Sequence, residues 1–152
     1  MEIKVVNVNS SFIISSIEEL MIEHFNEVNA TEKIENLIID WEKYIFLQQK
    51  GLLIPIGVFK DDKMIGYSCM HITESLHYKN KIVALSDAIF IKKDFRKSSV
   101  GLRLIKETEK ICFSVGVKEI HWYVKPNSAL QKIFDLKKYT IRDIVYIKQG
   151  EV

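Results

Sequence analysis

Binding chemistry is indicated most strongly by a basic, small-residue loop that joins a hydrophobic strand to a helix. The segment 89–104 reads IFIKKDFRKSSVGLRL. At the start of a helix the first backbone N–H groups have no partner within the helix, and the helix dipole adds partial positive charge, so phosphate is favoured there. Ser98, Ser99 and Gly101 carry small side chains that let a ligand approach these amides. The segment therefore predicts a site for an anion of diphosphate size.

Cationic side chains accompany this loop. Arg96 and Lys97 precede the predicted helix, and Arg103 lies one turn inside it. A guanidinium group binds phosphate through paired hydrogen bonds, which strengthens the prediction. The alternative is an ordinary serine-capped helix preceded by solvated basic residues, and the composition of the loop alone does not choose between the two.

Three ionisable side chains are candidates for moving protons: Asp87, His24 and His77. Asp87 interrupts an apolar strand, and regular alternation places it on the same face as Ile89 and Ile91. His24 falls on the apolar stripe of a predicted helix, and His77 falls in a loop. Structural interpretations stay open for each, as a hydrogen-bond acceptor or ion-pair partner for Asp87, a core residue for His24 and a surface residue for His77.

Hydrophobic periodicity predicts the elements that position these residues. Strands are expected over 3–8, 52–59, 64–73, 81–91, 118–124 and 140–147, and helices over 13–28, 31–51, 100–115 and 127–137. The strand over 81–91 is apolar on both faces, which is typical of a central strand. The order β-α-α-β-β-β-α-β-α-β predicts an α/β (mixed α+β) fold with a mixed sheet covered by helices.

Composition limits the classes of function. The 152-residue chain is 47% hydrophobic and is expected to form one domain over residues 1–152. Its net charge of +2 provides no broad field for nucleic acid or an anionic membrane. Cys69 and Cys112 fit no metal-ligand spacing and are expected in the core, so no metal site is predicted. No secretion signal or bilayer-spanning apolar run occurs, which predicts a cytoplasmic protein.

The segment 96–101, Arg-Lys-Ser-Ser-Val-Gly, resembles the coenzyme A diphosphate loop of GNAT acyltransferases. In that pattern Arg or Gln is followed after two residues by Gly, and after one more by Gly or Ala. Ser99 stands at the first glycine and tolerates fewer backbone angles than glycine does. The resemblance extends over roughly residues 23–147, and in detail it is similar to small bacteriophage-encoded members. The matching pieces are 76–78, 87–91, 101–105, 109–110 and 124–127.

The resemblance implies an acetyl-coenzyme A-dependent N-acetyltransferase that acts on a primary amine of a small molecule, peptide or protein by direct transfer in a ternary complex. It also implies that the central strand and the following parallel strand splay apart around the cofactor. Backbone groups of Ile89 and Ile91 would pair with the pantetheine arm, and Asn127 would contact that arm. The residues that the resemblance places at the cofactor are Ile89, Phe90, Ile91, Arg96, Lys97, Ser98, Ser99, Val100, Gly101, Leu102, Arg103, Asn127 and Phe134.

Phe134 departs from the family pattern, because it stands where the family often has a tyrosine that protonates the departing sulfur. Tyr139 or Tyr123 could supply that proton instead. The alternative is a coenzyme-binding or protein-interaction module that has lost fast turnover. A nucleic-acid-binding interpretation rests on the basic loop alone and lacks a phosphate-loop element or a nucleic-acid-binding fold pattern. The acceptor has no diagnostic motif, and the resemblance also allows a homodimer.

Overall fold

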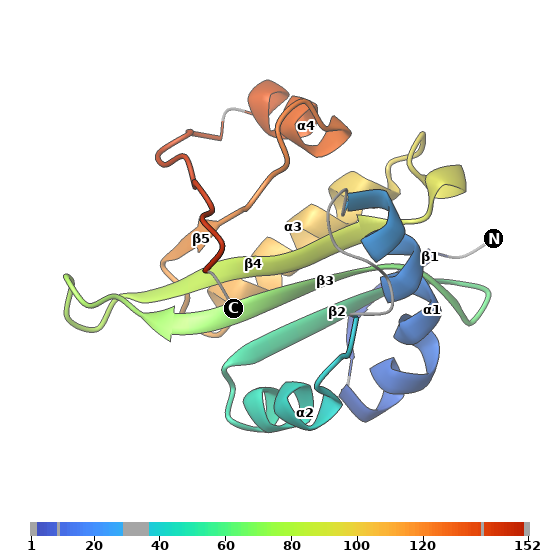
Figure 1. Ribbon diagram of the computed structural model, residues 1–152, viewed down its shortest axis with the longest axis horizontal. Coiled ribbons are helices and arrows are strands. Elements are labelled where there is room, and N and C mark those ends of the chain that lie inside the picture. Colours follow the sequence, from blue (N-terminus) through green and yellow to red (C-terminus); the bar gives the residue numbers. More distant parts are fainter. Residues whose placement is uncertain (1–2, 9, 29–36, 138, 151–152) are drawn as a thin grey trace.

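The fold is built on a five-stranded sheet, seen in a computed structural model that describes residues 3–8, 10–28, 37–137 and 139–150 (Figure 1). The strand order is β1-β2-β3-β4-β5. Neighbouring strands are antiparallel from β1 to β4, and β5 is parallel to β4. The strands are β1 (Ile3–Asn7), β2 (Leu53–Lys60), β3 (Lys63–Glu74), β4 (Ile82–Ile91) and β5 (Glu119–His121). The predicted mixed sheet is confirmed.

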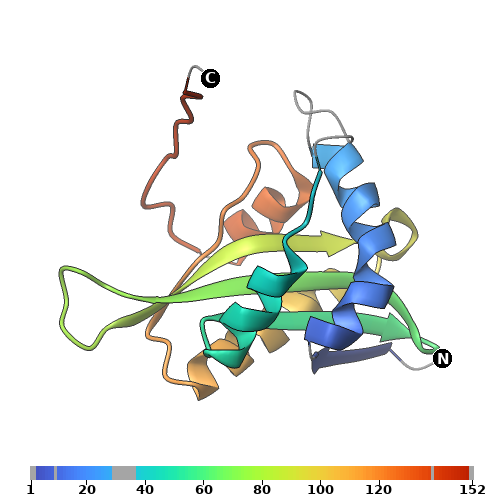
Figure 2. The ribbon, with the colours of Figure 1, turned by 60° about the horizontal axis from the view of Figure 1, so that its bottom comes forward.

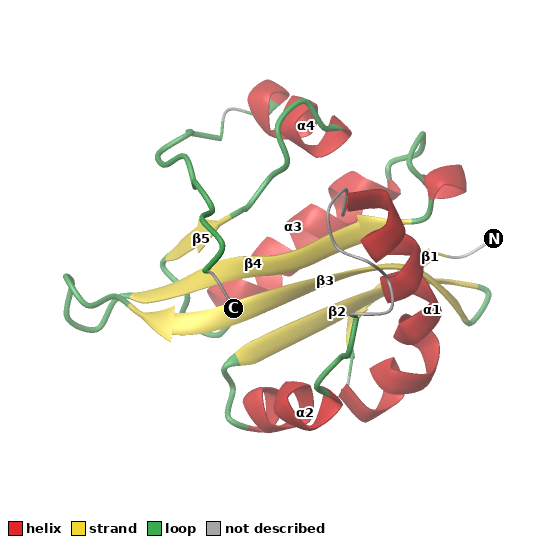
Figure 3. Cartoon of the chain, in the orientation of Figure 1, coloured by secondary structure: helices red, strands yellow, loops and turns green. Residues whose placement is uncertain are grey.

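Helices cover both faces of the sheet. They are α1 (Ser10–Val28), α2 (Trp41–Gln49), α3 (Val100–Ser114) and α4 (Ala129–Leu136), with a short 3-10 turn, η2, at Lys93–Phe95. Helices α1 and α2 lie on one face and α3 on the other, as Figures 2 and 3 show. None of the helices in the described part of the chain combines the length and apolar character needed to cross a membrane.

Two hydrophobic clusters hold the layers together. The larger lies beneath α3 and includes Met70, Ala84 and Leu104, none of which is measurably exposed. The smaller lies beneath α1 and includes Leu20 and Phe90. Cys69 and Cys112 are buried free thiols, as predicted. Burial of both sheet faces explains the continuous apolar sequence of the central strands.

Strands β4 and β5 pair only at one end. Their register joins Val83 to Glu119, Ala84 to Ile120 and Leu85 to His121, and β5 then ends. The N–H of Tyr123 donates to the Ser86 side-chain oxygen at 2.7 Å. Beyond this point the chain runs away from β4 toward α4 (Figure 3). The predicted splay of the central strands is therefore present, and the strand predicted over 118–124 is shorter because its second half leaves the sheet.

A β-bulge interrupts β4 at Asp87. Cys69 of β3 pairs with Ala88 and Met70 pairs with Ser86, which leaves Asp87 as the extra residue on β4. A bulge shifts the alternation of side chains by one residue. Ile89 and Ile91 therefore join the cluster beneath α3. Asp87 instead contacts Tyr44 of α2 on the opposite face, so the prediction that Asp87 shares a face with Ile89 and Ile91 is wrong.

The second predicted helix, over 31–51, begins later than expected. Residues 37–40 are not helical, and α2 starts at Trp41, while residues 29–36 lie outside the described part of the chain. The Asp40 carboxylate accepts a hydrogen bond from the Lys43 N–H at 2.9 Å, which is a typical N-cap. The apolar positions before Asp40 have helical spacing, but the cap sets the observed start.

The strand predicted over 140–147 is not formed. Residues 140–150 have no regular secondary structure, and Ile141 and Ile147 are 71% and 88% exposed. Alternating apolar residues favour an extended chain, but a strand needs a neighbour that supplies backbone hydrogen bonds. The short β5 is the nearest candidate, and Arg142 contacts it through side chains, donating to Glu119 at 2.7 Å.

Glu119 contacts three basic side chains, and we expect it to govern how the stability of the fold changes at acidic pH. Its carboxylate accepts hydrogen bonds from Lys81, His121 and Arg142, and these lower its pKa to about 2, with Lys81 the largest cause. Because this value lies below the ordinary value of about 4.3, the stabilisation is complete above that pH and is lost as the pH falls toward 2. We expect wild type to lose more thermal stability between pH 7 and pH 3 than Glu119→Gln does.

Circular dichroism melts at pH 7, 5 and 3 measure this difference. Glu107→Gln is the matched control, because Glu107 pairs with the exposed Lys110 one turn away. Equal acid sensitivity of Glu119→Gln and wild type would show that this cluster does not govern acid unfolding.

Candidate functional site

The first turn of α3 presents an open surface at the predicted anion loop. Ser99, which precedes the helix, has φ −72° and ψ 1°, angles that any residue adopts. Serine at this position therefore introduces no backbone strain. A Cβ added at Gly101 would meet no atom within 4 Å. The backbone amides of this turn can thus be approached from outside, and glycine matters here for space rather than for conformation.

Arg96 is held by two partners. Its Nε donates to the Ile91 carbonyl at 2.6 Å, and its two terminal nitrogens donate to the two carboxylate oxygens of Glu27, each at 2.6 Å. The hydrogen bonds from Arg96 lower the pKa of Glu27. Arg96 also lies 5.3 Å from the centre of the Phe90 ring. Its guanidinium is fixed beside the end of β4, next to the start of α3.

The C-terminal end of α1 contacts both segments that diverge where β5 leaves β4. On the β4 side, Arg96 binds Glu27, and Lys92 lies 3.7 Å from Glu23. On the β5 side, Lys125 donates to the Val28 carbonyl at 2.7 Å. The last two turns of α1 therefore bridge the two segments that diverge after Leu85.

The remaining basic residues of the loop differ in their surroundings. Lys97 is exposed. Arg103 donates to the Ile3 carbonyl of β1 at 2.9 Å. Beside Leu102 lies a surface hollow of about 280 Å³, lined also by Lys106, Glu109, Lys137 and Tyr139.

The free side of β4 carries backbone groups of Ile89 and Ile91. The Lys92 N–H donates to the Ile65 carbonyl of β3 at 2.9 Å. Successive residues of a strand direct their backbone groups to opposite neighbours. Ile91 and Ile89 therefore direct theirs to the side that β5 has left, where the Ile91 carbonyl meets Arg96. An extended ligand could pair here as an additional strand does.

His24 and Tyr67 form a partly buried pair on the α1 side of the sheet. His24 Nδ1 lies 2.7 Å from the Tyr67 hydroxyl, and the imidazole stacks on Phe90 with ring centres 4.8 Å apart. Burial is the largest cause that lowers the pKa of His24 and raises that of Tyr67. Both groups are therefore neutral near pH 7. The neutral imidazole can accept or donate a hydrogen bond without carrying a charge.

Asp87 lies at the centre of a second polar group on the same face. Its Oδ2 accepts a hydrogen bond from the Tyr44 hydroxyl at 3.1 Å, and its Oδ1 lies 3.7 Å from His71 Nε2. The side chains of His71 and Asp87 remain 42% and 37% exposed. Burial, followed by the charge of Asp87, raises the pKa of Tyr44, which keeps this donor protonated. The bulge thus presents a carboxylate that is fixed on one side and accessible on the other.

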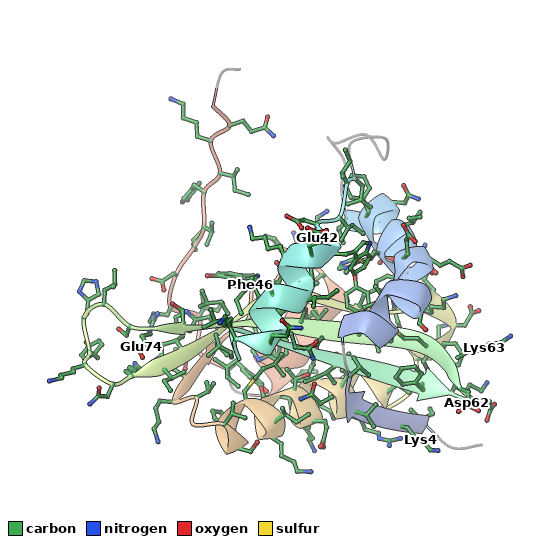
Figure 4. The ribbon with its side chains drawn as sticks, turned by 90° about the horizontal axis from the view of Figure 1, so that it is seen from below. Lys4, Glu42, Phe46, Asp62, Lys63 and Glu74 are labelled. Atoms are coloured by element: carbon green, nitrogen blue, oxygen red, sulfur yellow. The ribbon has the colours of Figure 1, made fainter. Side chains whose placement is uncertain are left out.

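His77 is not brought to the predicted anion loop. It is exposed in the hairpin 75–80 between β3 and β4. Figure 4 places Glu74, at the base of this hairpin, and Lys63 at opposite ends of the sheet. The anion loop follows Ile91, whose partner Gly66 is near the Lys63 end. His77 therefore lies at the other end of the sheet from that loop.

Asn127 and Phe134, the two predicted cofactor residues that follow β5, differ in exposure. Asn127 is exposed with φ 63°, and its N–H donates to the Gln131 side chain at 2.7 Å. Phe134 is buried and packs against Trp122 and Tyr139, with ring centres 5.6 Å and 4.4 Å away. It has a packing role in this structure.

Tyr139 is poorly suited to donate a proton. Its hydroxyl donates to Glu109 at 2.5 Å, and burial together with this hydrogen bond raises its pKa. A phenol with a raised pKa is a weaker acid toward a departing thiolate. Tyr123, the other candidate, is 53% exposed.

Sequence reasoning missed Tyr44 and Tyr67, and it did not connect Glu27 with Arg96 or His71 with Asp87. Glu27 and Arg96 lie 69 positions apart, and Tyr44 and Asp87 lie 43 apart, so no local spacing connects them. Alternation on β3 does place Tyr67, Cys69 and His71 on one face. That pattern could have grouped His71 with Tyr67, but the bulge, which separates the face of Asp87 from that of Ile89 and Ile91, leaves no signal in the alternation.

Comparisons with known proteins agree with this geometry. The sequence matches the model of the Acetyltransferase (GNAT) family over residues 14–134. A search among curated proteins finds no match. A ribosomal-protein-alanine N-acetyltransferase from Brucella melitensis biovar Abortus 2308 has a similar structure, with a TM-score of 0.76, 10% identity, and coverage of 99% of this chain and 100% of that one.

Two aminoglycoside-related structures are also similar. An aminoglycoside acetyltransferase from an uncultured soil metagenomic sample has a TM-score of 0.76 and 14% identity over 99% of this chain and 96% of that one. AAC(6')-Iy, in complex with the bisubstrate analogue CoA-S-monomethyl-acetylneamine, has a TM-score of 0.71 and 16% identity over the whole of both chains. At these identities the likeness establishes the fold, and the expected similarity to bacteriophage-encoded members stays a prediction. The family match over most of the sequence, on this splayed sheet, shows that the chain belongs to the GNAT acetyltransferase family.

Proposed function

We propose that this protein transfers an acetyl group from acetyl-coenzyme A to a primary amine of a small molecule, peptide or protein. The observation that carries the proposal is the backbone edge of β4 at Ile89 and Ile91, which β5 has left and where Arg96 holds the Ile91 carbonyl, beside the open space at Gly101 of α3. A pantetheine arm needs backbone partners, and a diphosphate needs free amides. Both occur next to each other in a member of the acetyltransferase family.

The residues at this edge fit coenzyme A in different ways. Ile89 and Ile91 would hold the pantetheine arm through their backbone, since their side chains pack beneath α3. The amides of Ser99, Gly101 and Leu102 would receive the diphosphate beside the charge of Lys97, while Arg96, held by Glu27, would order the loop. Phe90 and Val100 are buried, so they would shape the site from within. When bound, acetyl-coenzyme A supplies the activated acetyl thioester.

Asp87 is the carboxylate that we place in the proton-transfer step at the acceptor amine. It lies at the bulge, two residues before Ile89, with one carboxylate oxygen held by Tyr44. The exposed part of this carboxylate can contact a cationic amine that enters between α1 and α2. His24, neutral and stacked on Phe90, would form one wall of the acceptor site. We expect a cytoplasmic protein, and a homodimer remains compatible with the proposal.

A coenzyme-binding module without fast turnover is the second candidate. It is favoured by Phe134, which is buried against Trp122 and Tyr139 and cannot protonate a thiolate. Thiolates are tolerable leaving groups, because the thiol has an ordinary pKa near 8.5. Turnover therefore does not depend on an acid at this position, and we place the module second.

Two measurements test the proposed function. Acetyl-coenzyme A at about 100 times its dissociation constant should add roughly 2.7 kcal/mol of stability, a rise in melting temperature of several degrees. Release of free thiol is then followed with a panel of alkylamines, amino sugars and lysine peptides. Binding without acetyl transfer to any amine would favour the module, and no melting shift at millimolar ligand would reject both candidates.

A further inference from the structure

We propose that His71 takes the proton of the acceptor amine and that Asp87 holds the resulting imidazolium. This inference rests on the proposed acetyl transfer. It assigns one step of that reaction to a histidine that lies outside the coenzyme loop. His71 lies on β3, in register with Leu85 of β4 and Leu53 of β2. Its Nε2 is 3.7 Å from Asp87 Oδ1, close enough for a small shift or one water to join them.

The chemistry of the two groups favours this division of work. A neutral imidazole accepts a proton and releases it again readily, and histidine is the side chain that serves most often as a general base. A carboxylate beside an imidazole stabilises the cation that forms and orients the ring. Asp87 is itself fixed by the Tyr44 hydroxyl at 3.1 Å. Tyr44, Asp87 and His71 thus form a chain from a buried donor, through a carboxylate, to a half-exposed base.

Exposure distinguishes His71 from the other histidine on this face. The imidazole of His24 is stacked on Phe90, bonded to Tyr67, and held neutral by burial. It has no carboxylate in direct contact among the described residues. His71 is 42% exposed and next to Asp87, so it can reach both the amine and solvent. His71 is therefore the histidine on this face that can both accept a proton and release it.

The step balances as follows. The acceptor ammonium loses one proton to His71 Nδ1, directly or through one water, while the Nε2–H faces Asp87 Oδ1. The freed lone pair of the amine forms the N–C bond to the acetyl carbon. The C–S bond breaks, and its electron pair leaves with sulfur. The second proton lost from nitrogen balances the thiolate as thiol, while His71 returns the first proton to solvent. Products are the amide, the free thiol and one proton.

Variants at two neighbouring positions of β3 test the proposal. His71→Ala should lower kcat by about 100-fold with the amine that wild type acetylates best, while the melting shift with acetyl-coenzyme A stays unchanged. Imidazole added to the buffer should restore part of the lost kcat, which a purely structural role would not allow. Thr73→Ala is the matched control, because Thr73 is exposed on the same face two residues further along. It should retain the kcat of wild type.

A measurement without coenzyme or amine tests the contact itself. Asp87→Asn should change the ring nitrogen chemical shifts of His71 in the free protein at pH 6, and leave those of His77 unchanged. His71→Ala with kcat within twofold of wild type, or His71 shifts that ignore Asp87→Asn, would overturn the inference. A wild-type protein that acetylates no amine in the panel would instead overturn the proposed function, and this inference with it.

Discussion

Gly101→Glu should abolish the rise in melting temperature that acetyl-coenzyme A produces, while the free protein remains folded. A Cβ at this position meets no atom within 4 Å, so a longer side chain starts in open space. A carboxylate in the first turn of a helix is also favourable toward the dipole. The same carboxylate would occupy and repel the space that a diphosphate needs, and we expect coenzyme affinity to fall by more than about 100-fold, a change of at least about 2.7 kcal/mol.

Melting curves with and without acetyl-coenzyme A measure this effect. Gly101→Gln is the matched control, because it adds nearly the same volume without the charge. It should retain part of the shift if repulsion is the larger cause. Arg96→Ala is a less specific probe, since it also releases Glu27 and the Ile91 carbonyl. A full melting shift in Gly101→Glu would show that the coenzyme does not bind at the start of α3.

Asp87→Asn should lower kcat by 10²- to 10⁴-fold, the range expected for loss of a positioned base or of the group that holds it. Asparagine keeps the size of aspartate and can still accept the hydrogen bond from Tyr44. It removes the charge that faces His71. Because both groups are partly exposed, loss of their ion pair should cost at most about 1 kcal/mol of folding stability.

Steady-state kinetics with the preferred amine, together with the coenzyme melting shift, separate chemistry from binding. The shift should equal that of wild type, because the substitution leaves the backbone of Ile89 and Ile91 in place. Asp135→Asn, an exposed acid on α4, is the control and should retain wild-type kcat. An Asp87→Asn variant with normal turnover would remove this carboxylate from the mechanism.

Periodicity was sufficient to predict most of the framework. The apolar runs that became β2, β3 and β4 are buried on both faces, so their composition directly reflects their position. The helix α3 combines a buried stripe with a polar side and was predicted almost to its ends. The prediction of a strand over 140–147 was wrong. Its apolar side chains alternate as they do in a strand, but in the described part of the chain no strand pairs with this segment.

The candidate site was only partly predictable. The anion loop is continuous in sequence, so local rules for helix starts identify it. The contacts of Arg96 with Glu27 and of Asp87 with Tyr44 join distant segments, and they depend on how α1 and α2 cross the sheet. The face on which Asp87 lies could not be read from alternation either, because one extra residue changes the pattern in the middle of the strand.

The bulge at Asp87 also makes β4 respond differently to the loss and to the gain of one residue. Ile82 and Ala84 before it, and Ile89 and Ile91 after it, all pack beneath α3, although even and odd positions would normally lie on opposite faces. Deleting the extra residue would restore regular alternation, with Ile89 and Ile91 still beneath α3, and would remove the carboxylate that contacts Tyr44. Inserting one more residue would instead turn Ile89 and Ile91 toward α1 and α2 and the Phe90 ring toward α3. Among descendants of this chain, a shorter β4 can therefore keep its packing but not its carboxylate, whereas a longer one would lose the packing of its last residues.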